Sequence, residues 1–311
     1  MSRKLTAAVA QMGPVPLADT RATTVKRLSA LLREAASSGA RFVVFPELAL
    51  TTFFPRYWME EESEIDRFFE SRMPGPQTRP LFDLAKDLGV GFYLGYAERA
   101  EKEGKVHRYN SAILVERDGR ILGRYRKIHL PGHSEYLPHA PFQHLEKRYF
   151  EVGDEGFKVW RAFDAVVGMC ICNDRRWPET FRVLALQGAE IVALGYNTPC
   201  ENIYHEEPLH LRMFHHRLSL QANAYQNASW VLAAAKAGKE DGFGLIGGSA
   251  IVAPTGEIAA QAQGEGDEVI AFTLDLELGD YLRRTVFNFE KHRRIEHYRL
   301  ITERVGAREE V

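Results

Sequence analysis

The sequence contains few cysteines, no apolar run long enough to cross a membrane, and no excess of charge of one sign. Its three cysteines are an odd number, which favours reduced thiols over a disulfide framework. A membrane-spanning helix needs roughly 20 apolar residues in succession, and the opening segment MSRKLTAAVAQ turns polar too soon for a signal peptide. These absences predict a cytoplasmic protein with no membrane partner.

Positive and negative charges nearly balance, with 40 Lys plus Arg against 42 Asp plus Glu. Without a basic excess, nucleic acid is not expected as a partner. We see no linker in the 311 residues, so we expect a single α/β domain over residues 1–311. Its strongly charged last segment, about residues 280–311, is expected to pack on another subunit of a homodimer or homotetramer, or to stay partly mobile.

Strand and helix patterns alternate along the chain, and the two halves have a similar layout, which predicts two sheets with helices outside. Residues 117–119 form a turn signal that predicts a hairpin. Strands are expected over residues 5–11, from residue 42, and over 91–96, 109–116, 120–126, 166–172, 191–194, 229–235, 247–252 and 257–262, and helices over 20–38, 77–88, 178–187 and 208–226.

Cys172 ends an apolar run and is followed by polar residues and then by Pro178. A strand that stops at a cysteine, turns and enters a helix at a proline is typical of a nucleophile elbow with sulfur in place of the hydroxyl. Such a turn leaves the backbone N–H of Asn173 free to face an oxyanion. The alternative is that Cys172 is one more small buried hydrophobic residue, which is the commonest fate of a free cysteine.

Two other segments deliver a charged side chain where a strand ends: Glu47 follows the apolar segment from Phe42, and Lys127 stands at the end of a second strand, just before a Pro-Gly turn. Each could be half of an ordinary ion pair. Together with Cys172 they can converge at the carboxyl edge of a sheet, where α/β folds place their sites.

The chain resembles the nitrilase superfamily of carbon–nitrogen hydrolases in three motifs: FPE at 45–47, RKIHLP at 126–131, and CND followed by WPE between 172 and 179. The resemblance implies a four-layer αββα sandwich of two mainly mixed sheets, a Glu47–Lys127–Cys172 triad, and neither metal nor other cofactor. It also implies that Glu146 lines the site and holds Lys127 or the substrate amine. The alternative for Glu146 is a plain surface residue.

Attack on an amide requires a thiolate, a stabilised oxyanion and a proton for the departing amine. We expect Lys127 to lower the pKa of Cys172 and to share the oxyanion with the N–H of Asn173. Glu47 fits the general base that takes the thiol proton, passes it to the leaving nitrogen and later activates water.

The residues after the cysteine suggest the substrate. Nitrile-cleaving members of the superfamily typically have Trp-Glu there, whereas Asn173-Asp174 resembles the amidase and carbamoylase branches. Arg175 and Arg176 could bind a carboxylate in a bidentate manner. Alternatively, one of them faces solvent or pairs with Asp174 or Glu179.

This pattern resembles most the branch that hydrolyses N-carbamoyl-D-amino acids to the amino acid, carbon dioxide and ammonia. The alternatives are a β-ureidopropionase-like enzyme, an aliphatic amidase, and a non-catalytic protein that binds small carboxylates.

Many histidines lie in the middle of the sequence and invite a metal interpretation, but the resemblance implies none. It implies instead that His129 and His144 stand in the site wall and hydrogen-bond the substrate, with His215 supporting them from the long helix. Asn197 and Thr198 follow a predicted strand, so they can reach the substrate carboxylate.

Overall fold

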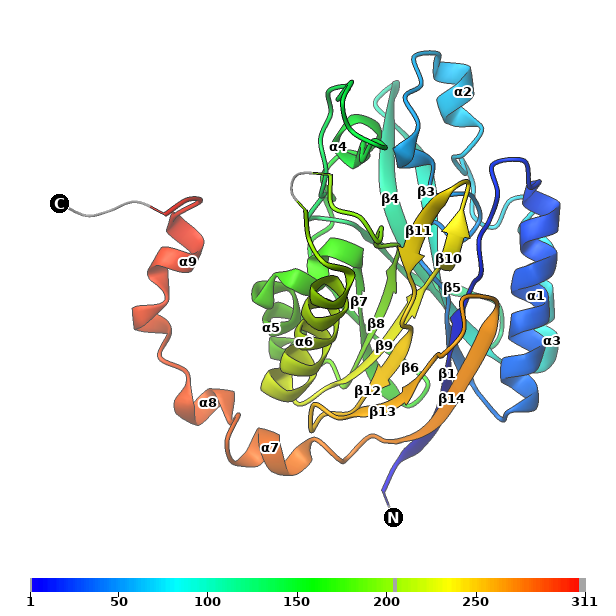
Figure 1. Cartoon of the computed structure of the whole chain (residues 1–311). Coiled ribbons are helices and arrows are strands. Elements are labelled where there is room, and N and C mark those ends of the chain that lie inside the picture. The colour runs from blue at the N-terminus through cyan, green and yellow to red at the C-terminus, as the bar shows by residue number, and fades with distance from the viewer. Residues whose placement is uncertain (1, 204–205, 308–311) are drawn as a thin grey trace.

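The computed structural model describes residues 2–203 and 206–307, in which two six-stranded sheets face each other (Figure 1). The first sheet has the order β14 (Glu268–Asp275), β1 (Lys4–Gln11), β2 (Phe42–Val44), β3 (Gly91–Lys102), β4 (Lys105–Val115), β5 (Ile121–Arg126). The second has the order β13 (Ile258–Gln261), β12 (Ala250–Val252), β9 (Trp230–Ala235), β8 (Ile191–Tyr196), β7 (Ala165–Ile171), β6 (Val159–Ala162). A separate hairpin joins β10 (Ala237–Glu240) to β11 (Phe243–Ile246).

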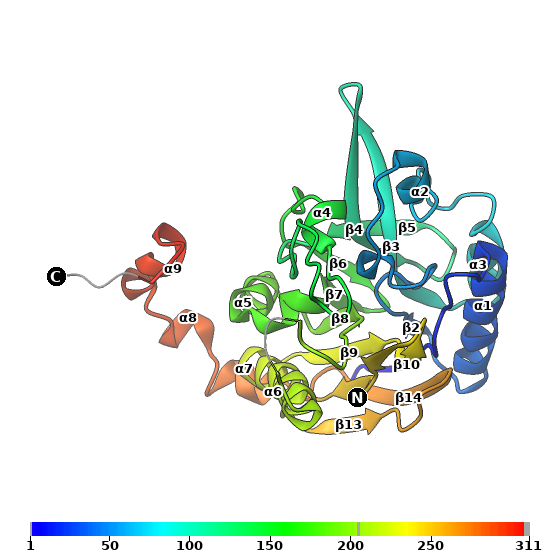
Figure 2. The same ribbon diagram turned by 45° about the horizontal axis from the view of Figure 1, so that its top comes forward.

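Helices cover the outer face of each sheet, which completes the expected four layers of an α/β sandwich (Figures 1 and 2). On the first sheet these are α1 (Arg21–Ser37) and α3 (Arg79–Leu88), and on the second α5 (Pro178–Leu186) and α6 (Leu209–Asn227). Short helical segments in the connections are η1 (Phe54–Arg56), α2 (Glu62–Asp66), α4 (Glu146–Tyr149) and η2 (Cys172–Arg176).

Both faces of the inner strands are buried, so these strands are apolar throughout instead of alternating with polar residues. On β1, Ala7 and Val9 join the core between the two sheets, whereas Ala8 and Ala10 join the core beneath α1 and α3. This follows from the twofold period of side chains along a strand.

The parallel strands fix where the site can form. β1, β2 and β3 are parallel in the first sheet, and β7, β8 and β9 are parallel in the second. Antiparallel partners at the edges make both sheets mixed. Residues that follow β2, β7 and β8 therefore leave the sheets at their carboxyl ends, where α/β folds bind ligands.

Some elements differ from the sequence-based expectation. β3 and β4 are longer than predicted and form a hairpin through Glu103 and Gly104, both with positive φ. Strand β14 was not predicted; it returns from the end of the domain to pair with β1 over eight residues. β6, β10 and β11 were also not predicted.

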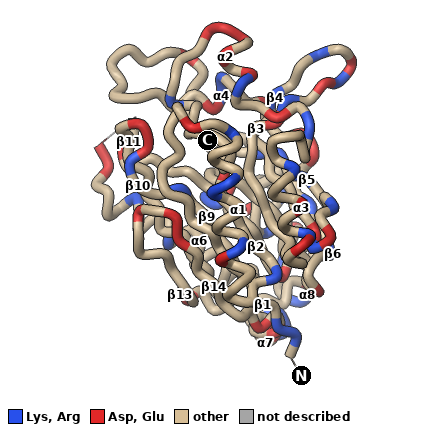
Figure 3. Tube along the Cα trace, turned by 90° about the vertical axis from the view of Figure 1, so that its right-hand side faces the viewer, with Lys and Arg blue, Asp and Glu red and all other residues tan. Residues whose placement is uncertain are grey.

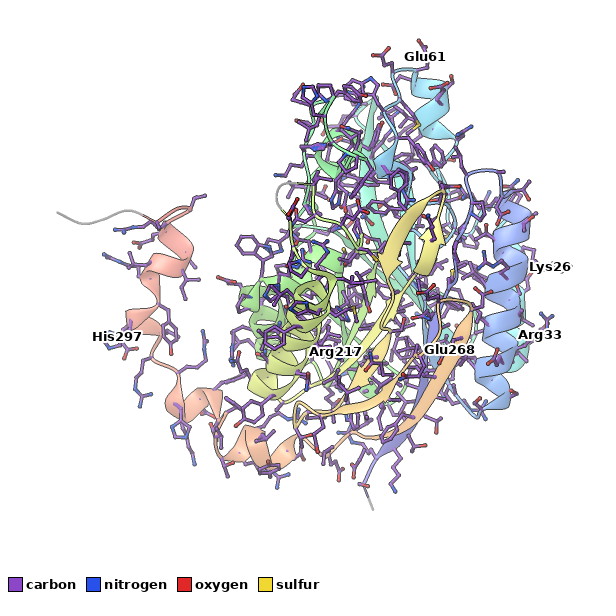
Figure 4. The ribbon with its side chains drawn as sticks, viewed as in Figure 1. Lys26, Arg33, Glu61, Arg217, Glu268 and His297 are labelled. Carbon is purple, nitrogen blue, oxygen red and sulfur yellow. The ribbon has the colours of Figure 1, made fainter. Side chains whose placement is uncertain are left out.

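The C-terminal arm extends from the body as α7 (Asp280–Arg284), α8 (Phe289–His292), η3 (Ile295–His297) and α9 (Arg299–Glu303) (Figures 1 and 2). Figure 4 shows His297 on this arm, well separated from the sandwich. The last four residues of the expected arm, 308–311, lie outside the described residues.

Acidic and basic residues are interspersed over the same elements in Figure 3, in keeping with the balanced composition. Within residues 2–203 and 206–307, no helix combines the length and the hydropathy that crossing a membrane requires.

Candidate active site

Glu47 lies just beyond β2 and is fully buried. Its Oε1 accepts hydrogen bonds from Lys127 Nζ at 2.8 Å and from Asn110 Nδ2 at 2.8 Å. Its Oε2 accepts one from the backbone N–H of Asn197 at 2.8 Å. Lys127 and Asn110 belong to the first-sheet side and Asn197 follows β8, so this carboxylate joins the two sheets.

Two glycines make room for the Glu47 segment. A Cβ on Gly95 of β3 would lie 2.6 Å from Pro46 O, and one on Gly195 of β8 would lie 2.5 Å from Glu47 N. One glycine comes from each sheet. Any larger residue at either position would therefore displace the segment that carries Glu47.

Lys127 follows β5 and is also fully buried. Its Nζ lies 2.8 Å from Glu47 Oε1 and 2.6 Å from Glu146 Oε2. Burial alone would lower the pKa of Lys127, but Cys172, Glu146 and Glu47 together raise it above the ordinary value. The side chain is therefore an ammonium ion held between two carboxylates.

The two carboxylates differ in acidity. Burial raises the pKa of Glu47 above its ordinary value, and repulsion from Glu146 adds to this against the attraction of Lys127. Burial also acts to raise the pKa of Glu146, but Lys127 and His144 outweigh it, and the pKa is lowered. His144 Nε2 lies 3.3 Å from Glu146 Oε1. Glu47 is therefore the carboxylate suited to accept a proton, and Glu146 is the permanent anion.

Cys172 stands directly after β7 with a φ of 47°, a conformation that residues other than glycine seldom adopt. Its side chain is buried, with Sγ 3.9 Å from Asn197 O and 3.8 Å from Arg175 Nη1. The strained turn is the geometry of a nucleophile elbow.

The structure corrects the expected acidity of this thiol. Burial raises the pKa of Cys172, and the negative charge of Glu47 raises it further. Lys127 and Arg175 lower this pKa, but by less than burial and Glu47 raise it. The thiol is therefore protonated at rest, because removing it from water costs more than the nearby cations return. Attack by this sulfur would need a base to take the proton.

The two arginines differ from each other, although the sequence suggested a matched pair. Arg175 is fully buried; its Nη1 donates to Cys172 O at 2.7 Å and its Nη2 to Thr198 Oγ1 at 2.8 Å. Arg176 is exposed, and its Nη1 lies 3.4 Å from Asn173 Oδ1. Arg175 thus supports the turn at Cys172, whereas the side chain of Arg176 reaches the surface, although partial burial of its guanidinium and repulsion from Arg175 lower its pKa to about 10.

Asn197 is buried and is used within the protein: its Nδ2 donates to Glu47 O at 2.7 Å, and its Oδ1 accepts from Lys236 N at 3.3 Å. The expected reach of its side chain to a carboxylate is therefore replaced by a role in holding Glu47. The expected support of His129 and His144 by His215 is wrong. His215 is exposed and pairs with Glu207, whereas His216 is buried and bonds Tyr196.

Three residues of this network were not assigned from the sequence. Asn110 orients Glu47, and Asp174 accepts hydrogen bonds from Tyr125 and from His129. Asn110 and Tyr125 carry no motif signal, because they lie in the interior of strands. Asp174 is part of the CND motif but was considered only as a partner for the arginines.

A metal centre finds no support among the described residues, where no three His, Cys, Asp or Glu side chains are grouped to hold an ion.

The chain matches the family model "Carbon-nitrogen hydrolase" over residues 6–284. It is 34% identical to "Nitrilase" of Pyrococcus abyssi, covering 86% of this chain and 90% of that protein. It is 33% identical to "N-carbamoylputrescine amidase" of Arabidopsis thaliana, covering 84% of each. A crystal structure of a carbon–nitrogen hydrolase from Helicobacter pylori G27 superposes with a TM-score of 0.83, at 25% identity, over 97% of this chain and 99% of that one.

These names span more than one substrate class, so they support the family and not the narrower carbamoylase branch. The family match spans both sheets apart from the first two residues of β1, and it includes every residue of the candidate site. The chain belongs to the carbon–nitrogen hydrolases of the nitrilase superfamily.

Proposed function

We propose that the protein is a cysteine-dependent amidohydrolase that cleaves N-carbamoyl-amino acids of D configuration. The observation that carries hydrolysis is the buried Glu47–Lys127–Glu146 cluster at the same sheet edge as Cys172. An isolated buried ion cluster is costly to maintain. The charges of this cluster act on the protonated thiol of Cys172, which stands on a strained turn, and a catalytic role for the cluster explains why it is buried there.

The reaction follows from the protonation states. Glu47 takes the thiol proton as Cys172 Sγ attacks the carbamoyl carbon, and Lys127 and the N–H of Asn173 stabilise the oxygen. Glu47 then gives the proton to the departing nitrogen, which leaves a thiocarbamate on Cys172. Water, deprotonated by Glu47, cleaves this thiocarbamate to a carbamic acid and restores the thiol, and the carbamic acid loses carbon dioxide to release the second nitrogen as an amine or ammonia. The net change converts R–NH–CO–NH2 and water into R–NH2, carbon dioxide and ammonia.

The carbamoyl group is supported by the relative from Arabidopsis thaliana, whose name specifies an N-carbamoyl substrate. The carboxylate is supported by Arg176, a surface residue whose guanidinium lies beside Asn173 and has no carboxylate partner among the described residues. Thr198 Oγ1 accepts from Arg175 Nη2, so its hydroxyl hydrogen is a further donor. A substrate is held at its carboxylate and at its carbamoyl carbon, and the pocket wall contacts its side chain. Three such points of attachment are the minimum for distinguishing the two enantiomers.

A panel of substrates tests the proposal. N-carbamoyl-D- and L-α-amino acids, N-carbamoyl-β-alanine, N-carbamoylputrescine and simple amides would be compared by kcat/KM, with a thiol alkylator as control. We expect the N-carbamoyl-D-amino acids to be preferred. Preference for N-carbamoyl-β-alanine or simple amides would establish the alternative enzymes, preference for N-carbamoylputrescine would contradict the carboxylate site, and no turnover would indicate a binding protein.

Replacing Arg176 by alanine should raise KM for carboxylate substrates about tenfold or more, because a charge-assisted contact contributes about 1.5–3 kcal/mol. Arg176→Lys should restore little, since an ammonium cannot make the paired contact. The matched control is a substrate whose carboxylate is a carboxamide, for which KM should barely change. Equal losses on both substrates would make Arg176 structural. Arg175→Ala should instead lower kcat, because Arg175 holds the nucleophile turn.

We further propose that a second copy of the chain packs against α5, α6 and the arm. Large apolar side chains are exposed here, including Phe214 at 55% and Leu218 at 50%. A groove of about 820 Å³ lies between α5 and the arm, with an apolar lining that includes Val183, Leu186 and Ile301. Such a face with an extended arm beside it suits a self-complementary interface.

The double substitution of Phe214 and Leu218 by aspartate should convert the assembled protein into monomers in sedimentation velocity. The control is Lys26→Asp on α1, on the other side of the molecule from α6, which Arg217 marks in Figure 4. An unchanged sedimentation coefficient for the double variant would contradict this interface.

A further inference from the structure

Asp174 has the densest set of hydrogen bonds near the nucleophile. Its carboxylate is fully buried. Oδ2 accepts from the backbone N–H of Ile171 at 2.9 Å and from Tyr125 OH at 2.7 Å. Oδ1 accepts from the backbone N–H of His129 at 3.0 Å and lies 2.7 Å from its Nδ1. One side chain thus joins the end of β7, strand β5 and the segment that carries His129.

These contacts determine how His129 is protonated. Oδ1 of a carboxylate can only accept, so Nδ1 of His129 must carry a proton. In the neutral imidazole Nε2 is then a bare acceptor. The ring is held by stacking on Trp177, with centroids 4.9 Å apart, and on Phe157, at 6.1 Å. In the described part of the chain, Nε2 has no hydrogen-bond partner, and the side chain is 23% exposed.

His129 also borders the oxyanion site, since its carbonyl accepts from Asn173 Nδ2 at 3.2 Å. Nε2 of His129, an acceptor beside the N–H of Asn173, cannot bind the carbonyl oxygen of a substrate, because that oxygen is an acceptor too. It can bind an N–H of the nitrogen that is bonded to the carbonyl carbon. The donor of Asn173 and the acceptor of His129 then match the two ends of an amide or carbamoyl group.

We propose that Asp174 is a positioning residue that holds His129 in its Nδ1–H form, so that Nε2 accepts a hydrogen bond from an N–H of the scissile group. This rests on the proposed amide hydrolysis. An ester has no such N–H, so Asp174 would favour amides over esters without itself touching the substrate. Asp174 anchors Ile171 with its other oxygen, so the nucleophile turn and the acceptor are set by one carboxylate.

The protonation of His129 is tested directly by 15N NMR of imidazole-labelled protein at about pH 8.5, where a free imidazole is neutral. The His129→Gln variant assigns the signals. We expect a protonated Nδ1 and an unprotonated Nε2. A protonated Nε2 in the resting protein would overturn the proposal. Because this measurement needs no substrate, its failure is distinct from failure of the proposed function.

A double-mutant cycle tests the link to Asp174. Asp174→Asn keeps the size of the side chain but leaves it only one acceptor oxygen. We expect kcat/KM for an amide substrate to fall about ten- to a hundredfold, which is the scale of losing the partner that orients a functional histidine. In the His129→Gln background, the further loss should be small. Full additivity of the two losses would show that Asp174 does not act through His129.

Tyr125→Phe is the matched control, since it removes one hydrogen bond to the same carboxylate but leaves the pair with His129. Its 15N spectrum should be that of the native protein, even where its melting temperature falls as much as that of Asp174→Asn. The amide-to-ester ratio of kcat/KM should fall in Asp174→Asn and hold in Tyr125→Phe. Equal ratios in both variants would reduce Asp174 to a structural residue.

Discussion

Cys172→Ala is expected to reduce turnover to below about one per cent of the native rate, because no other group in the site can form the covalent intermediate. Substrate binding should change little, since the sulfur makes the new bond but few of the contacts that hold the substrate. Steady-state kcat and calorimetric binding of an uncleaved substrate would measure the two effects. Retention of several per cent of activity would require a different nucleophile.

Cys200→Ser is the matched control, because Cys200 is the more exposed of the other two cysteines. It should keep nearly all activity. Mass spectrometry after limited alkylation should locate the inactivating modification on Cys172. Inactivation that tracks labelling of Cys200 would contradict the assignment of the nucleophile.

Lys127→Ala should lower kcat at least about a hundredfold, which is the scale of losing a donor to the oxyanion. The substitution also leaves Glu47 and Glu146 buried without their shared cation, and breaking such a pair costs about 3–5 kcal/mol of stability. Circular dichroism and a melting curve would therefore accompany the kinetics. A folded variant with near-native kcat would remove Lys127 from the catalytic group.

The pH profile distinguishes lost catalysis from lost folding. Lys127 lowers the pKa of Glu47, so removing it should raise that pKa further. Glu47 acts as a base in its charged form, which is lost as the pH falls. The acid limb of kcat/KM should therefore move to higher pH in folded Lys127→Ala protein. In Glu47→Gln, the acid side of the pH profile should show no decrease that comes from protonation of residue 47. If the acid limb of Lys127→Ala is not shifted, the base is a residue other than Glu47.

The strand ends at Glu47 and Cys172 could be predicted because each follows an apolar segment typical of a buried strand. The strand end at Lys127 could be predicted from the hairpin turn at 117–119, since the strand itself, ILGRYR, carries two arginines. The chemistry around them could not. Whether Cys172 is a thiol or a thiolate depends on the balance of burial, Glu47 and Lys127, whose separations are set by the packing of two sheets.

Adjacent residues were equally ambiguous. Arg175 and Arg176 are identical in sequence terms, but a tight turn sends successive side chains in different directions, so one is buried and the other exposed. The same holds for His215 and His216 on α6, where successive positions are about 100° apart around the helix. Only the fold decides which member of each pair faces the interior.

Strand β14 has a consequence for how the protein is made. Residues 268–275 complete the sheet that carries Glu47 and Lys127, yet they are synthesised after all the residues to which we assign a catalytic role. Until they emerge from the ribosome, β1 is an unpaired edge with eight residues open to other strands. We therefore expect nascent chains that stop before residue 268 to depend on chaperones and to lack activity, although they already contain the complete set of catalytic side chains.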